Sequence, residues 1–359
     1  YNNYEFAPSR IILWVAKQQH LYFGSFVLAV PIFCMLIEFI GIRVRDEDSV
    51  MAEKYDRLAK DLMKVSLTAY SWTAILGGIL LFTFITLFPG FFKYMAGIFR
   101  PVMHVYALMF LAESGVLYVY YYGWDKMKDD TFLKWIHCSL SVLLNLIGTV
   151  LMYLANSWAT FMQAPGGIDS EGRFLGNIWH VIHSTLWNPV GVHRILGNIV
   201  FGGGIVGAYA AYHYLTAKNE EERAHYDWVC YVAMFICIFG LIPLPFAGYW
   251  LMKEVYAFRQ QMGITLMGGI MAWLFIIQAV MIGLLFFAAN SYLHNGMARV
   301  KGSHRYMKYC KYMVLLLICC FTMWMTPHTI VMTPAELKAM GGAQHPIVGH
   351  FGVMSAKNT

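Results

Sequence analysis

His193 lies at the start of an apolar stretch and is followed by small residues at helical spacing. They come 4, 11, 14 and 18 positions later, at Gly197, Gly204, Gly207 and Ala211. At about 100° per residue, these positions form one narrow stripe below the histidine. A histidine above such a stripe can hold a flat, bulky prosthetic group. The same stripe is typical of close helix packing, with His193 at the helix end, so the spacing alone leaves both interpretations open.

Two acidic residues fall inside apolar stretches, where an ionisable side chain is costly and marks a functional site. Glu38 comes 18 residues after His20, so a straight helix would carry both on one face. Glu113 lies in the middle of another apolar stretch. Both carboxylates are candidates for a proton path or for the surroundings of a cofactor. The alternative for Glu113 is a neutral carboxyl group that hydrogen bonds to a neighbouring helix.

The composition predicts an all-α, polytopic membrane helix bundle. The chain has 359 residues, of which 59% are hydrophobic and only 13% are charged, against about 25% charged in soluble domains. About eight apolar stretches are long enough to cross a bilayer as helices. They cover approximately 11–42, 64–88, 101–123, 133–156, 191–216, 226–252, 265–293 and 308–327. We expect the bundle to occupy 1–327 and a tail to occupy 328–359.

The distribution of Lys and Arg predicts how these helices cross the membrane. The connections 43–64, 124–134, 217–225 and 294–311 are much richer in basic residues than the alternate connections. The positive-inside rule places the basic connections inside, and therefore both termini and the tail 328–359 on the outer face. The net charge of +6 then reflects these connections and gives no reason to expect nucleic-acid binding.

In this orientation, histidines from several helices gather toward the outer side, and they include His20, His104, His193 and His328. Imidazoles brought to one level by several helices suit b-type haem, whose iron takes axial histidine ligands. Arg194 would then pair with a haem propionate or extend toward the membrane surface. No CxxC motif occurs, which argues against covalently attached haem and against a zinc ribbon.

Short segments of this chain resemble the large, haem-carrying subunit of cytochrome bd-type quinol oxidases. The similarity lies in the order and spacing of 19–31, 111–114, 122–126, 154–158, 162–165, 188–193 and 211–215. The resemblance implies that His20 is the histidine of the paired high-spin haem site and that His193 is the histidine of the low-spin b haem. It makes Met271 the first candidate for the ligand opposite His193, with His104 and His328 next. It also places Glu113 near the haem pair.

The resemblance implies a quinol-binding loop after the sixth helix, which begins at Lys253 and Glu254. Here only about 253–263 separates the sixth and seventh spans. The expected site is therefore an open quinone site, or electrons arrive from a partner on the outer face.

The sequence thus predicts a b-haem membrane subunit of a bd-like respiratory complex in a bacterial-type cytoplasmic membrane. One to three b haems are expected, with no support for haem d, and oxygen would be reduced if the high-spin haem is kept. Expected partners are lipid and a second membrane subunit or an outer redox protein. Two alternatives are a bd-derived electron-transfer anchor without oxidase activity, and a transporter with structural histidines.

Overall fold

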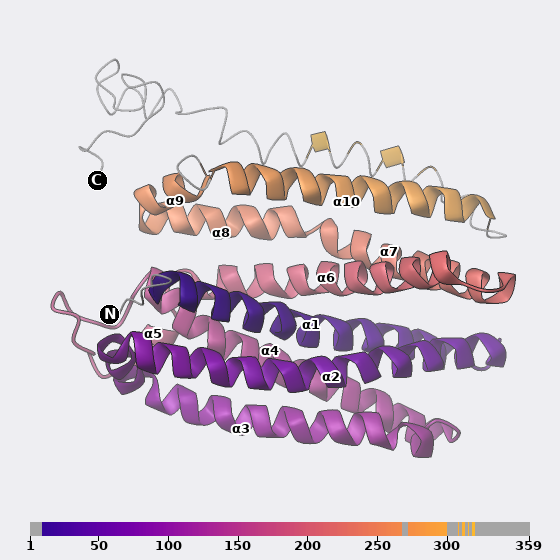
Figure 1. The fold of residues 1–359 in the computed structure, drawn as a ribbon, viewed down its shortest axis with the longest axis horizontal. Coiled ribbons are helices and arrows are strands. Elements are labelled where there is room, and N and C mark those ends of the chain that lie inside the picture. Colours follow the sequence, from indigo (N-terminus) through magenta and orange to yellow (C-terminus); the bar gives the residue numbers. More distant parts are fainter. Residues whose placement is uncertain are drawn as a thin grey trace. The chain divides into compact units, whose positions relative to one another are not determined.

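The computed structural model describes residues 9–267 and 272–299, together with isolated positions between 308 and 319. Ten helices form this part of the chain (Figure 1). They are α1 (Ser9–Val44), α2 (Ser49–Leu87), α3 (Pro89–Met127), α4 (Thr131–Gln163), α5 (Ile178–Ile182), α6 (Trp187–Thr216), α7 (Glu220–Leu241), α8 (Leu244–Phe258), α9 (Gln260–Met267) and α10 (Ala272–Arg299). The expected all-α fold is confirmed for these residues.

Seven helical stretches in the described residues are long and apolar enough to cross a membrane. They are α1, α2, α3, α4, α6, the continuous stretch Glu220–Phe258, and Trp273–Met297. These agree with the first seven predicted spans, although most helices extend beyond the predicted apolar limits. The eighth predicted span falls almost entirely outside the described residues, as does the tail 328–359. The orientation of the termini stays a prediction.

The helix boundaries follow from side chains that satisfy exposed backbone groups. Asp48 precedes α2 and accepts a hydrogen bond from the Met51 N–H at 2.9 Å. Asp130 does the same for α4, with the Leu133 N–H at 2.8 Å. Aspartate is a preferred residue at this position because its carboxylate pairs with an otherwise unbonded N–H of the first turn. The connections between α1, α2, α3 and α4 are only a few residues long, so consecutive helices run antiparallel.

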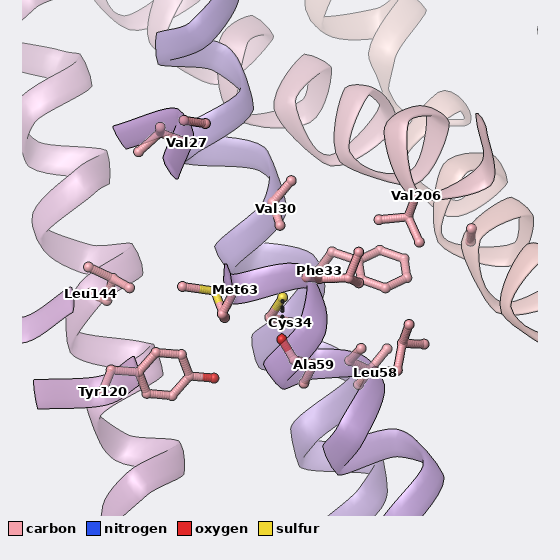
Figure 2. Close-up of a cluster of buried hydrophobic side chains, with 14 of the residues drawn as sticks. Val27, Val30, Phe33, Cys34, Leu58, Ala59, Met63, Tyr120, Leu144 and Val206 are labelled. Atoms are coloured by element: carbon pink, nitrogen blue, oxygen red, sulfur yellow. Dashed lines mark hydrogen bonds between the residues drawn. The ribbon is translucent and has the colours of Figure 1, made fainter. Parts of the chain in front are cut away.

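The chain divides into two compact units, 1–240 and 241–359. In the first unit, α1 is the central element and packs against α2, α4 and α6 (Figure 1). Its buried face contributes Val30, Phe33 and Cys34 to a core that continues through Met63 of α2 and Val206 of α6 (Figure 2). Dispersion contacts of this kind, rather than exclusion of water, hold helices together within lipid.

Two glycines of α6 bring its backbone against neighbouring helices. A Cβ atom at Gly202 would lie 2.8 Å from the carbonyl oxygen of Ala29 in α1. A Cβ atom at Gly203 would lie 2.9 Å from the carbonyl oxygen of Ala233 in α7. Neither contact can relax by moving a flexible side chain, because both involve backbone atoms. The α1–α6–α7 packing therefore requires glycine at these two positions.

The longest connection in the first unit, between α4 and α6, is ordered by Asp169. Its carboxylate accepts hydrogen bonds from the backbone N–H groups of Arg173 and Glu171 at 2.8 and 2.9 Å. These hydrogen bonds hold the pKa of Asp169 below its usual value, and the bond from the Arg173 N–H has the largest effect. The connection then forms the short helix α5, whose Val181 is buried at the ends of α3 and α4.

The second unit contains α8, α9 and α10. Lys253 and Glu254 lie within α8, with Lys253 exposed and Glu254 partly buried. The segment 253–263, expected to be a loop, is helical except at Arg259, where extended backbone separates α8 from α9. The expectation of a loop was wrong because a single residue is enough to turn the chain between two short helices.

Replacing Gly202 by alanine tests the close packing of α6. The new methyl group would collide with the α1 backbone, so we expect a loss of about 1–3 kcal/mol in the free energy of unfolding. Gly97→Ala in α3 is the control, because no atom of the described residues lies within 4 Å of a Cβ atom there. Denaturant titration of the purified protein would measure both. Equal stability of the two variants would contradict the packing assignment.

Candidate functional site

Glu38 is the centre of a buried hydrogen-bond network that joins three helices. Its side chain is fully buried, and its Oε2 accepts a hydrogen bond from the Tyr120 hydroxyl of α3 at 2.7 Å. Its Oε1 lies 2.5 Å from His137 Nδ1 and 2.7 Å from Lys134 Nζ, both of α4. Tyr120 and His137 also stack on each other, with ring centroids 4.4 Å apart. The carboxylate is thus fully satisfied inside the bundle.

The network holds one proton between His137 and Glu38. His137 Nε2 lies 2.9 Å from the backbone carbonyl oxygen of Tyr120, which can only accept a hydrogen bond. Nε2 therefore carries a hydrogen, and Nδ1 faces Glu38 Oε1. A hydrogen bond between Nδ1 and Oε1 needs one further hydrogen. It is carried either by Nδ1, which gives imidazolium and carboxylate, or by Oε1, which gives neutral imidazole and carboxylic acid. In both forms the pair has no net charge, so it can retain a proton within the bundle.

Lys134 connects this pair to the end of the bundle at which α1 ends and α2 begins. Its ammonium group contacts both Glu38 and Asp56 of α2, and Trp124 Nε1 donates to Asp56 Oδ2 at 2.9 Å. The Asp56 side chain is 22% exposed, whereas that of Lys134 is 6% exposed. Burial therefore increases from Asp56 through Lys134 to Glu38, so these three side chains connect the surface with the buried carboxylate.

A small cavity lies farther along the same bundle, and Glu113 is one of a few polar side chains in its mostly apolar lining. It is lined by residues of α1, α2, α3, α4 and α6, among them Ser66, Asn145 and Asn198. A Cβ atom at Gly148 would lie 3.1 Å from Glu113 Oε1, so the carboxyl group occupies space that only glycine leaves open. Asn145 donates to the Pro31 carbonyl oxygen at 3.2 Å and contacts α1 one turn before Glu38. Polar groups thus continue from the Glu38 network toward Glu113.

His20 contacts α2 at Thr73 and Gly77, rather than the α3 and α4 side chains that bind Glu38. Its Nδ1 lies 3.2 Å from the carbonyl oxygen of Thr73, and its ring covers Gly77, where a Cβ atom would lie 3.0 Å from His20 Cε1. Glu38 instead contacts α3 and α4. Pro31 lies between the two residues in α1. The two predicted site residues therefore contact different helices.

His193 lies at the opposite end of α6 from His213, near the start of the helix. Its Nδ1 is buried and has no hydrogen-bond partner in the described part of the chain. Of the predicted stripe, Gly197 and Gly204 have no described atom within 4 Å of an added Cβ atom, whereas Gly207 is covered by Met234 of α7. The stripe therefore contains both positions with open space and a position used for helix packing.

Arg194 turns toward α4 rather than toward the membrane surface. Its Nη1 donates to Asn156 Oδ1 at 2.5 Å, and the side chain is partly buried. His104 is exposed on α3 and contributes nothing to the sites described above. Met271 and His328 lie outside the described residues, so their predicted roles as haem ligands stay predictions.

Sequence reasoning missed four members of the Glu38 network, namely Asp56, Tyr120, Lys134 and His137. In the sequence, Lys134 is only one of the basic residues of the connection 124–134, and Asp56 lies unremarked in the connection 43–64. One signal was available: Lys134 and His137 are three residues apart in an amphipathic stretch, so they share a helix face. Nothing in the sequence shows that this face meets Glu38.

A comparison with known protein families matches residues 9–272 to the family described as cytochrome bd terminal oxidase subunit I. The chain belongs to that family. Among solved structures, it is similar to bd oxidase from Geobacillus thermodenitrificans, with a TM-score of 0.71 over 98% of this chain and 91% of the other. At 12% identity, this similarity shows the shared fold. A search of curated protein sequences finds no match.

Membership of the bd oxidase family carries three general consequences. The chain is a multi-pass membrane protein of a family that resides in the bacterial cytoplasmic membrane. The family works in a complex with another subunit and uses haem cofactors. The residues present fit such a cofactor, because His193 has a buried nitrogen without a partner in the described residues and His20 has one ring nitrogen fixed by a backbone carbonyl group.

Lys134→Met tests whether the buried network stabilises the bundle. Removing the ammonium group leaves Glu38 and Asp56 without their shared cation, and breaking a buried ion pair costs about 3–5 kcal/mol. Lys128→Met is the control, because Lys128 is exposed and lies 3.9 Å from Asp125, where such pairs contribute less than about 1 kcal/mol. Denaturant titration should separate the two variants, and equal stabilities would refute the assignment.

Proposed function

We propose that this bd-family chain is the b-haem-carrying subunit of a respiratory complex that passes electrons from quinol or an outer redox partner to haem and on to oxygen. The observation that carries the proposal is a pair of half-buried histidines, His20 and His193, each with a ring nitrogen that has no hydrogen-bond partner in the described residues. The haem, when bound, supplies the redox-active iron and the oxygen-binding position.

His20 is prepared as an iron ligand by its contact with α2. The Thr73 carbonyl oxygen accepts, so His20 Nδ1 must carry the hydrogen. The lone pair then resides on Nε2. Histidines that bind metal commonly donate the other N–H to a carbonyl group, which fixes the tautomer and the ring orientation. This is the arrangement expected for the histidine of the high-spin site.

His193 supports a second haem position. Its Nδ1 is buried without a hydrogen-bond partner in the described residues, and such an unpaired nitrogen is unfavourable. His193 would hold the haem through its imidazole, and the bound group would fill the space beside the ring. The open positions beside Gly197 and Gly204 on the same helix leave space for a planar group. Met271 is proposed as the ligand on the other side. One to three b haems remain the proposed cofactors.

The proton supply is proposed to follow the polar groups of the first unit. Asp56 and Lys134 would pass protons from the inner face to the Glu38–His137 pair. Asn145 and Ser66 line the way to Glu113, which would deliver protons near the haems. Ser66 Oγ is buried without a partner in the described residues, so it is available to a water molecule in this cavity.

Electron delivery is proposed from quinol near Lys253 and Glu254, or from an outer redox protein. Lys253 is exposed and Glu254 partly buried, so α8 offers a hydrogen-bond donor and a proton acceptor to a quinone head group. A second membrane subunit would cover part of the exposed apolar side chains of α2 and α3, and lipid would cover the rest.

His193→Ala tests the haem assignment. We expect the purified variant to insert and to lose one low-spin haem, because the substitution removes the axial ligand. Reduced-minus-oxidised spectra and pyridine-haemochrome quantification would measure the loss. An unchanged low-spin α band would refute the role of His193. Cyanide-sensitive oxygen uptake by the parent complex would test the oxidase step, and its absence would favour an electron-transfer anchor.

Gly77→Ala tests the positioning of His20. A methyl group 3.0 Å from His20 Cε1 would displace the ring from its contact with Thr73, so we expect loss or a spectral shift of the high-spin haem. Gly78→Ala is a matched control one residue away, where no described atom lies within 4 Å. Identical spectra for both variants would contradict the proposed ligand geometry.

A further inference from the structure

Two positive side chains, one near the start of α1 and one near the start of α6, lie within electrostatic range of each other and have no carboxylate partner in the described residues. Lys17 of α1 and Arg194 of α6 are both partly buried and interact electrostatically with each other. Neither forms an ion pair with any residue in the described ranges. Two like charges within a membrane bundle repel each other and lose hydration. Their proximity therefore calls for an anion.

Asn156 of α4 supplies an independent sign of a missing ligand. It is 0% exposed, and its Oδ1 accepts the hydrogen bond from Arg194 Nη1. The orientation of the amide is fixed by this bond, since a guanidinium group can only donate. Asn156 Nδ2 is left buried and without a partner in the described chain. An orphaned donor of this kind costs about 1–3 kcal/mol.

The three helices that carry these groups pack against one another. Contacts join α1 to α4, α1 to α6 and α4 to α6. Arg194 also lies close enough to His193 to act electrostatically on its ring. The cations and the amide donor are therefore gathered beside the histidine that has its own unpartnered nitrogen.

We propose that Lys17, Arg194 and Asn156 form a carboxylate-binding site, and that its ligand is a propionate of the haem held by His193. This inference rests on the proposed function for its source of the carboxylate. Arg194 keeps further N–H donors after its bond to Asn156, Asn156 Nδ2 adds a neutral donor, and Lys17 adds charge. A carboxylate would satisfy the orphaned amide and separate the two cations at once.

The site has a consequence for the electron affinity of the haem. Positive charge close to an iron centre favours its reduced form, because reduction adds one negative charge. Removing one of the two cations should therefore lower the reduction potential of the low-spin haem. For a charge at about 10 Å in a protein environment, the equilibrium constant for reduction falls about tenfold, which is about 59 mV for one electron.

The test compares Lys17→Gln, Arg194→Gln and Asn156→Leu in the purified, haem-loaded complex. Lys93→Gln is the control, because Lys93 is an exposed cation near the start of α3. Spectroelectrochemical titration measures the midpoint potential of the low-spin haem, and haemochrome analysis measures haem content. We expect lower potentials for the two charge variants, weaker haem retention for Asn156→Leu, and no change for the control. Arg194→Lys keeps the charge and should restore most of the potential.

Three outcomes would overturn the inference. The first is an unchanged potential and haem content in all three variants while His193→Ala still loses its haem, which would leave the proposed function intact. The second is equal shifts in Arg194→Gln and Arg194→Lys, which would indicate a purely structural role. The third is loss of co-purifying anionic phospholipid without a change in potential, which would identify a lipid phosphate as the ligand. Retention of the low-spin band in His193→Ala would instead refute the haem assignment itself.

Discussion

The buried carboxylate of Glu38 is the interaction on which the first unit depends. A charged group inside a membrane bundle is tolerated only when other groups replace its hydration. Glu38 obtains this replacement from Tyr120 of α3 and from Lys134 and His137 of α4, while Lys134 also engages Asp56 of α2. The central helix α1 is thereby fixed in depth and rotation against three neighbours. The same fixation orients His20 toward α2.

The sequence was sufficient for features that depend on local periodicity. Apolar length determined the positions of the first seven spans, and an acidic residue in an apolar stretch singled out Glu38 and Glu113. Partners in space could not be derived in this way. Glu38 and His137 are 99 residues apart, and only the rotation of α4 brings them together. The glycine stripe shows the same limit, because Gly207 faces Met234 of α7 whereas Gly204 faces no described atom within 4 Å of an added Cβ atom.

The two ends of the bundle have opposite electrostatic character. Around Glu38, each acidic group has a cation or a proton beside it, so the network is close to neutral. Around Arg194, two cations meet without an acidic partner in the described residues. This difference suits the proposed function. A neutral relay can accept and release protons, and a positive end favours electron uptake by a nearby haem.

Unsatisfied polar atoms give the strongest argument for where a ligand belongs. Lipid offers no hydrogen bonds, so a helix bundle must pair its own polar groups or leave them to a ligand or water. In the described residues, the buried side-chain atoms without a partner belong to Ser66, Asn156, Ser184 and His193. Ser184 lies in the connection before α6, and Ser66 lines the cavity of Glu113. Asn156 and His193 are instead joined through Arg194, which donates a hydrogen bond to Asn156 and directly follows His193 in α6. The described part of the bundle satisfies the Glu38 network with its own side chains, whereas the unpartnered atoms of Asn156 and His193 beside Arg194 need a partner that these residues do not supply.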